Sequence, residues 1–178
     1  PLNQVFFSPR VRYFIDFEDY SDLELFTMEQ FVRKILDVGS ATGRHILHLQ
    51  DLGLDASAMD ISETCGSLMK LLGIEHIIVD DIYKYQSESF DTISMMMNGI
   101  GISGNIDGLK KLLNHLKTIL NPRGQILADS SDITYLYENE KLPTGKYFGE
   151  LTFQYEYKGE FGESFDWLYI DPTTLLDV

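Results

Sequence analysis

The stretch KILDVGSATGRHILHL, residues 34–49, decides the fold. Four residues typical of a buried strand, 35–38, carry an acid near their end, Asp37, and lead into a loop that contains Gly39 and Gly43. A helical pattern of apolar residues follows directly. Because glycines let a ligand lie against the backbone, a strand that turns through them into a helix indicates a binding site at the turn.

The rest of the chain repeats this alternation of short apolar runs and helical patterns, which predicts βαβ units around a mainly parallel sheet. Strands are expected at residues 35–38, 55–59, 77–79, 92–97 and 125–129, and helices at residues 43–52, 62–72 and 107–120. The sequence Asn-Pro-Arg-Gly at 121–124 is typical of a turn and is expected to end the last helix. The predicted fold class is therefore α/β.

The two ends of the chain differ from this middle part. The first 33 residues are aromatic and acidic, and we expect helices that cap the sheet, although a lid over a ligand would use the same composition. Apolar and polar residues alternate from 151 to 157, and a turn at 158–162 with a return strand at 164–170 completes a predicted antiparallel hairpin. We expect a single domain in three parts, incomplete at its C-terminus: a cap at 1–33, a core at 34–132 and a hairpin at 147–171.

The composition is that of an ordinary globular protein: of 178 residues, 44% are hydrophobic and 24% are charged. Lys and Arg number 14 against 28 Asp and Glu, and a net charge of −14 repels polyphosphates, so we expect no nucleic-acid partner. No apolar run reaches the roughly 18 residues that span a bilayer, so no membrane segment is expected. The single cysteine, Cys65, and the lack of a leader pattern favour a cytoplasmic location.

Polar side chains follow every strand of the predicted sheet. They are Asp37, Asp60, Asp81, Asn98 and Asp129. In an open parallel sheet, ligands bind beyond the carboxyl ends of the strands, so these side chains are expected to share one crevice. Four of the five are acidic, although random placement would scatter acids over the helix surfaces. Taken singly, each acid is equally well explained as a helix cap or a solvated turn.

The glycine loop argues against two common nucleotide sites. A phosphate-binding P-loop reads G-x-x-x-x-G-K-[ST], but here the second glycine comes one residue early and Arg44 follows it. A dinucleotide fold requires G-x-G-x-x-G, which the loop from Gly39 to Gly43 does not provide. Asp60 nevertheless lies about 20 residues after the glycines, where a carboxylate accepts both ribose hydroxyls.

These residues resemble a known family. The sequence ILDVGSATG is similar to motif I of the class I S-adenosylmethionine-dependent methyltransferases, D-x-G-x-G-x-G, with Ala41 in place of the middle glycine. The resemblance continues through AMDIS, VDDIYKY, FDTISMMMNGIG and LKTILNPRGQILAD, and covers residues 35–132. It implies a Rossmann-like doubly wound sheet of strand order 3-2-1-4-5, an enzyme that uses S-adenosylmethionine, and no metal site.

The resemblance also implies a role for each matching residue. The loop backbone would border the methionine part of the cofactor, with Asp37 near its ammonium group and Asp60 on the ribose hydroxyls. Asp81 would accept from the adenine amino group, the Ile82 amide would meet the ring, and Asn98 with Gly99 would line the sulfonium side. The cofactor-binding set is Asp37, Gly39, Ser40, Ala41, Gly43, Asp60, Ile61, Asp81, Ile82, Asn98 and Gly99.

The methyl acceptor is less well indicated. We expect the acceptor to be a small molecule. The sequence assigns no catalytic residue, because methyl transfer needs a general base only for a protonated amine or a hydroxyl. It does not indicate an oligomeric state either. A polar group after the fifth strand is placed to face an acceptor, or is a plain polar turn: Asp129, Ser130, Asp132, Tyr135 and Tyr137. The hairpin aromatics either wall a substrate pocket or form core: Phe153, Tyr155, Tyr157, Trp167 and Tyr169.

Three alternative functions remain. An aminopropyltransferase uses the decarboxylated cofactor on a related fold, but would be expected to carry an acidic site where this sequence has Asn98 and Gly99. A nicotinamide dehydrogenase fits the spacing of Asp60 but not the glycine pattern. A catalytically silent methyltransferase fold that binds a protein partner would bind the cofactor without turnover.

Overall fold

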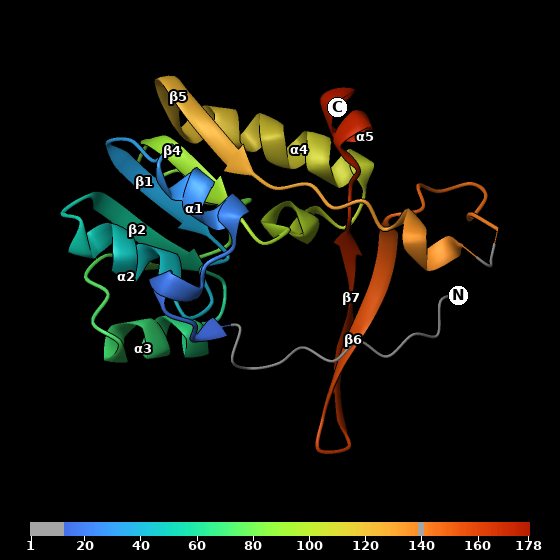
Figure 1. Ribbon diagram of the computed structural model, residues 1–178, viewed down its shortest axis with the longest axis horizontal. Helices are drawn as coiled ribbons and strands as arrows, with labels where there is room; N and C mark the ends of the chain where they lie inside the picture. The colour runs from blue at the N-terminus through green and yellow to red at the C-terminus, as the bar shows by residue number, and fades with distance from the viewer. Residues whose placement is uncertain (1–12, 139–140) are drawn as a thin grey trace. The chain divides into compact units, whose positions relative to one another are not determined.

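The computed structural model describes residues 13–138 and 141–178 (Figure 1). Five strands form one parallel sheet with the order β3-β2-β1-β4-β5, and two further strands form an antiparallel hairpin. The predicted Rossmann-like order is therefore confirmed. The chain divides into two compact units, one that ends at Tyr85 and one that starts at Gln86. The predicted single domain with three parts stays a prediction.

The first unit contributes β1 (Lys34–Val38), β2 (Asp55–Asp60) and β3 (Ile77–Val79), which pair in parallel and lie where the sequence predicts. The register places Asp37 opposite Ala58 and Asp60 opposite Val79. β1 and β2 are buried along most of their length because their residues are apolar or small on both faces. The strands therefore bring their carboxyl ends to one edge of the sheet.

The helices of this unit are α1 (Asp22–Met28), α2 (Arg44–Asp51) and α3 (Glu63–Leu71), with a short 3-10 turn, η2 (Phe17–Asp19), ahead of them. The apolar face of α2 packs on β2, and α3 packs on β2 and β3. The Ser62 side chain caps α3 by accepting from the Cys65 amide at 3.3 Å, as its sequence position predicts. The N-terminal part is helical as predicted in α1 and η2, while residues 1–12 of the predicted cap lie outside the described residues.

The second unit contributes β4 (Phe90–Met95), β5 (Leu120–Ala128), α4 (Ile106–Leu116) and α5 (Pro172–Leu176), with 3-10 turns η3 (Gly99–Ser103), η4 (Lys117–Ile119) and η5 (Thr134–Tyr137). β4 pairs with β5 in parallel. Leucines at helical spacing make the core of this unit, and three of them on α4 are fully buried: Leu109, Leu112 and Leu116.

Three predicted boundaries in this unit are wrong. The helix expected at 107–120 ends at Leu116, because η4 tightens its last turn and Leu120 already belongs to β5. The expected turn at 121–124 lies within β5, where the pairing register shifts between Phe90 and Thr92 and a bulge absorbs the turn residues. β4 ends two residues earlier than predicted, since Met97 has a left-handed backbone, with φ 58°.

The hairpin consists of β6 (Glu150–Tyr157) and β7 (Glu160–Leu168), so the expected turn at 158–162 is shorter than predicted. Lys158 and Gly159, at φ 53° and 82°, make a two-residue turn that matches the twist of the strands. Phe153 and Phe165 stack at 6.1 Å between ring centroids, but Tyr155 is 66% exposed. The prediction that the hairpin aromatics form core is therefore wrong for the half of the hairpin next to the turn, where Tyr155 and Tyr157 are exposed.

Candidate cofactor site and acceptor side

The loop between β1 and α2 is fixed to the end of β2 by hydrogen bonds. The backbone amides of Gly39 and Ser40 both donate to the Met59 carbonyl, at 2.9 Å and 3.0 Å. The Ser40 hydroxyl donates to the Asp37 carbonyl at 2.8 Å and accepts from the Met59 amide at 3.2 Å. Asp37 itself is 5% exposed. The structure thus brings together the first acid, the loop and the second strand.

The two glycines of the loop differ in the space around the position that a Cβ would occupy. Both have a left-handed backbone, with φ 76° at Gly39 and 73° at Gly43. A Cβ added to Gly43 would collide with the Ile74 and Met69 side chains, so this position serves the packing of α2. A Cβ added to Gly39 would meet no atom within 4 Å. Gly39 therefore borders open space at the carboxyl end of β1, which is the cradle that a ligand needs.

Asp60 joins the loop to the following helix. Its Oδ2 accepts from the Ala41 amide and its Oδ1 from the Ser62 amide, each at 2.9 Å. Because a carboxylate oxygen has two lone pairs, both oxygens keep capacity to accept from a ligand. The next residue, Ile61, is 73% exposed and adds an apolar surface beside the carboxylate.

Asp81 is engaged in a local turn after β3. Its Oδ1 accepts from the Tyr83 amide at 3.0 Å, and its Oδ2 forms an ion pair with Lys84 at 3.0 Å. Burial first, and the Asp81 charge second, raise the pKa of the Tyr83 phenol. The Asp80 amide donates to the Asp60 carbonyl at 3.2 Å, so the ends of β2 and β3 are neighbours, while Ile82 is buried. The adenine contacts expected of Asp81 and Ile82 remain predictions.

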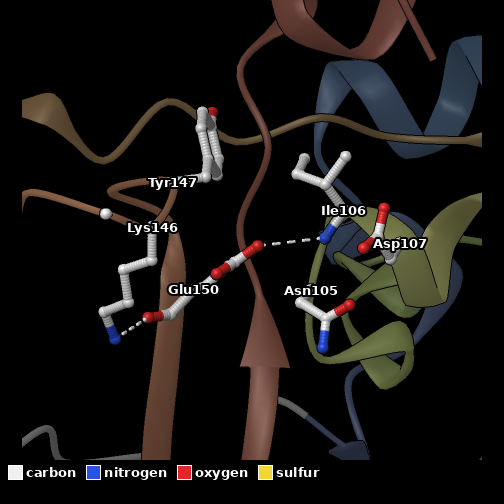
Figure 2. A pocket seen from close by; sticks show the side chains of 7 residues that line it. Asn105, Ile106, Asp107, Lys146, Tyr147 and Glu150 are labelled. Carbon is white, nitrogen blue, oxygen red and sulfur yellow. Dashed lines mark hydrogen bonds between the residues drawn. The ribbon is translucent and has the colours of Figure 1, made fainter.

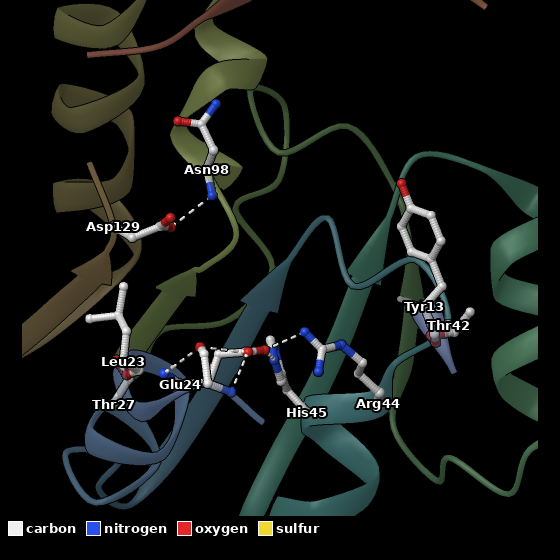
Figure 3. A network of polar contacts seen from close by, with 10 residues as sticks. Tyr13, Leu23, Glu24, Thr27, Thr42, Arg44, His45, Asn98 and Asp129 are labelled. Atoms are coloured by element: carbon white, nitrogen blue, oxygen red, sulfur yellow. Dashed lines mark hydrogen bonds and ion pairs between the residues drawn. The ribbon is translucent and has the colours of Figure 1, made fainter. Parts of the chain in front are cut away.

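In the second unit, Asn98 follows β4 after Met96 and Met97 and is the N-cap of η3 (Figure 3). Its backbone is left-handed at φ 60° and ψ 32°, and its amide donates to Asp129 Oδ1 at 2.7 Å. The side-chain Nδ2 donates to the Leu168 carbonyl at 3.1 Å, which fixes the orientation of the amide because a carbonyl only accepts. Asn98 is 7% exposed, and its Oδ1 has no hydrogen-bond partner among the described residues. The next amide, that of Gly99, donates to the Met96 carbonyl at 3.2 Å.

Of the polar group after β5, only Asp129 is shown in contact with Asn98. Asp132 Oδ1 accepts from the Thr134 amide at 2.8 Å, which agrees with a polar turn. The Tyr137 hydroxyl donates to the Phe148 carbonyl at 2.8 Å, and Tyr135 is 61% exposed. The sequence predicted this group as a whole, but the contacts single out its first member.

The first unit also contains a charged cluster that the sequence did not predict. Glu24 of α1 is 7% exposed, and its Oε1 accepts from the Arg44 guanidinium and from His45 Nε2, the latter at 3.1 Å (Figure 3). The hydrogen bond from His45, helped by those from Ser21 and Arg44, holds the pKa of Glu24 well below its usual range although burial opposes this. The S-x-x-E capping box from Ser21 to Glu24 was the available signal, but it predicts contacts only within α1.

A polar surface pocket of about 420 Å³ lies in the second unit, between the start of α4 and the segment that leads into β6 (Figure 2). Glu150 Oε1 accepts from the Ile106 amide at 3.1 Å, and Lys146 Nζ donates to the Glu150 carbonyl at 2.8 Å. The Tyr147 hydroxyl donates to Asp171 Oδ2 at 2.6 Å. These hydrogen bonds connect the start of α4 to β6, and the segment before β6 to the start of α5.

Two further findings concern the described part of the chain. None of the helices within residues 13–138 and 141–178 has the length and apolar character needed to cross a bilayer. Within the same residues, no three His, Cys, Asp or Glu side chains are grouped so as to hold a metal ion.

Comparison with known proteins identifies the family to which the chain belongs. No family model and no curated protein matches the chain. Among solved structures, it is similar to a SAM-dependent methyltransferase from Bacteroides fragilis in complex with S-adenosyl-L-homocysteine: 38% identity, TM-score 0.84, over 94% of this chain and 70% of that one. Methyltransferases from Methanosarcina mazei (17% identity, TM-score 0.65, 84% and 80% covered) and Clostridium acetobutylicum (17%, 0.62, 94% and 80%) share the fold.

The strand order, the open glycine loop and the acid at the end of β2 define an α/β protein of the open parallel type, a class that binds ligands beyond its strand ends. The similarity to the Bacteroides fragilis enzyme settles which kind: the chain belongs to the S-adenosylmethionine-dependent methyltransferases. It is an enzyme, and its cofactor is S-adenosylmethionine.

Proposed function

We propose that this methyltransferase acts on a small molecule rather than on nucleic acid. The observation that carries the proposal is the net charge of −14, because an acidic surface repels a polyanionic substrate. The buried Asn98 Oδ1 has no hydrogen-bond partner among the described residues, which leaves one acceptor for a donor group of a ligand or a water molecule. We also propose that the enzyme works in the reducing cytoplasm, in keeping with its single cysteine, Cys65.

The residues of the first unit fit the cofactor. Gly39 leaves open space beside the backbone, and Asp60 has lone pairs for ribose hydroxyls. Asp37 supplies a buried negative charge for the ammonium group. We propose that the loop from Gly39 to Gly43, including Ser40 and Ala41, holds the methionine part, with the adenine over Ile61 and near Asp81 and Ile82.

When bound, the cofactor supplies an activated methyl group on its sulfonium, so the protein needs no nucleophile of its own. Its residues orient the cofactor and the acceptor and exclude water, which lowers the barrier by proximity. We propose that Asn98 and Gly99 line the reacting side, on the strength of their place in the motif order. Asp129, which holds the Asn98 amide, is the candidate to take a proton from a protonated amine or a hydroxyl.

Methyl transfer from radiolabelled S-adenosylmethionine to a panel of small amines, phenols, alcohols and thiols tests the proposal. We expect label in at least one of these compounds, with S-adenosylhomocysteine as the other product. Transfer of label to RNA or DNA, and to no small molecule, would contradict it. A parallel incubation with decarboxylated S-adenosylmethionine and putrescine, in which methylthioadenosine would appear, reports on the aminopropyltransferase alternative. Cofactor binding without any turnover corresponds to the silent fold.

A further inference from the structure

One carboxylate links two helices of the first unit. Glu24 Oε2 accepts from the Ser21 amide at 3.0 Å and from the Ser21 hydroxyl at 2.8 Å, which completes the capping box of α1. Its Oε1 accepts hydrogen bonds from Arg44 and His45, the first two residues of α2. Both oxygens are therefore committed, one to each helix, so the carboxylate joins α1 to α2.

Aromatic side chains strengthen the same junction. The Arg44 guanidinium lies 4.6 Å above the Tyr20 ring, and the Tyr20 and His45 rings meet edge to face at 5.3 Å. The Phe17 ring stacks on His48 at 3.7 Å between centroids. Tyr20 and His45 are both 6% exposed, so the junction is buried at its centre.

The junction lies against the turn that leads from the cofactor loop into α2. Gly43 is the N-cap of α2 and has no side chain to cap it, and the first turn of α2 contains no acid. Glu24 instead supplies negative charge beside this turn, where it also interacts favourably with the helix dipole. One residue before Gly43, the Thr42 hydroxyl donates to the Tyr13 carbonyl, so the N-terminal segment holds the loop at a second point.

We infer that Glu24 is a positioning residue for the cofactor loop: through Arg44 and His45 it holds the first turn of α2, and thereby residues 39–43, in the conformation that binds the nucleoside. The inference rests on the proposed cofactor contacts of the Gly39 loop. It makes the docking of α1 and the binding of cofactor mutually reinforcing, because a coupling between two events acts equally in both directions. The N-terminal segment is then a functional part of the cofactor site and not only a structural cap.

The test measures S-adenosylhomocysteine binding by calorimetry in wild type and Glu24→Gln, which keeps the shape of the side chain and removes its charge. We expect the substitution to weaken binding about tenfold, within the usual range for coupled sites. Hydrogen exchange gives a second readout. S-adenosylhomocysteine should slow amide exchange in α1 of the wild type, and should do so much less in the variant.

Two controls separate positioning from plain destabilisation. Ser21→Ala removes the two capping-box contacts of the hydroxyl and keeps the hydrogen bond from the Ser21 backbone amide to Glu24. The contacts of Glu24 with Arg44 and His45 stay in place, so the variant should have a lower melting temperature without weaker ligand binding. Glu29→Gln removes an exposed charge just after α1 and should change neither. If Glu24→Gln does not fold, His45→Leu, which breaks one of the two links to α2, replaces it and should weaken binding in the same direction.

The outcomes discriminate between the two proposals. Wild-type affinity in Glu24→Gln or in its replacement, or ligand protection of α1 that persists in the variant, would overturn the positioning role while the cofactor site stands. Failure of the wild type to bind S-adenosylhomocysteine at all would overturn the proposed cofactor contacts, and the positioning role with them.

Discussion

Asp60 Oδ2 accepts from the backbone amide of Ala41 at 2.9 Å, so the acid at the end of β2 stabilises the loop after β1. A direct hydrogen bond thus joins two of the motifs that the sequence places at the strand ends. The contact shows that Asp60 supports the loop, and in the proposed site the same carboxylate also recognises the ribose.

Asp60→Ala is expected to weaken S-adenosylhomocysteine binding roughly 10- to 100-fold, since each hydrogen bond to a charged group contributes about 1.5–3 kcal/mol. Isothermal titration calorimetry measures this directly. Removal of the 2′-hydroxyl from the ligand should reduce the binding affinity less in the variant than in the wild type, because the variant lacks the carboxylate that binds this hydroxyl. The matched control is Asp55→Asn at the exposed start of the same strand, which should bind like the wild type. Equal losses for both ligands would show that Asp60 acts only on the loop.

Gly39→Ala and Gly53→Ala form a second matched pair. Both glycines have φ near 75°, at 76° and 75°, and a Cβ at either position meets no atom within 4 Å. Alanine in this backbone region costs about 1–2 kcal/mol, so both variants should lose similar thermal stability. Only Gly39→Ala should weaken cofactor binding, because only its methyl group enters the proposed cradle. Parallel melting and calorimetric titrations check this, and equal ligand affinity in the two variants would refute the cradle.

The pKa of Glu24 predicts an acid-dependent loss of stability. Because the folded-state pKa is depressed from its ordinary value of 4.5, the carboxylate stabilises the folded state fully above about that pH. The stabilisation is lost as the pH falls through the depressed value. The melting-temperature gap between wild type and Glu24→Gln should therefore be widest near pH 7 and narrow progressively below pH 4.5. A gap that stays constant between pH 7 and pH 3 would contradict a charged role for Glu24.

Tyr147 predicts the opposite dependence in the second unit. Burial, followed by the hydrogen bond to Asp171, raises the pKa of this phenol from 10.0 to about 12. A raised folded-state pKa means that the stabilisation is complete below pH 10.0 and is lost as the pH rises toward 12. Tyr147→Phe should cost about 1–3 kcal/mol at neutral pH and remove this alkaline dependence. Chemical denaturation at pH 7 and pH 11 checks it, and a variant with wild-type stability at both pH values would oppose the prediction.

The parallel core was predictable because local signals and tertiary packing agree there. The strand at 35–38 and the helix after Gly43 follow from apolar periodicity and two glycines, and the packing of α2 on β2 satisfies both. The turn expected at 121–124 failed because composition cannot distinguish a free turn from a bulge that the neighbouring β4 draws into a sheet.

The site was predictable only in part. The sequence predicts that Asp60 and the Gly39 loop lie together, because their spacing is a property of the chain itself, and their hydrogen bond agrees with this. Glu24 was missed, since its partners lie 20 and 21 residues away and no local pattern announces such a contact. For Asn98 the position was predicted, but its left-handed backbone was not, because Asp129 and the Leu168 carbonyl hold it from distant segments.

A crystal structure with S-adenosylhomocysteine tests directly whether the carboxyl ends of β1 and β2 hold the nucleoside of S-adenosylmethionine, as we propose. We expect both ribose hydroxyls at hydrogen-bond distance from the Asp60 carboxylate, roughly 2.5–3.0 Å, with the amino-acid part along the backbone from Gly39 to Ala41. A nucleoside bound elsewhere, with its ribose out of reach of Asp60, would contradict it.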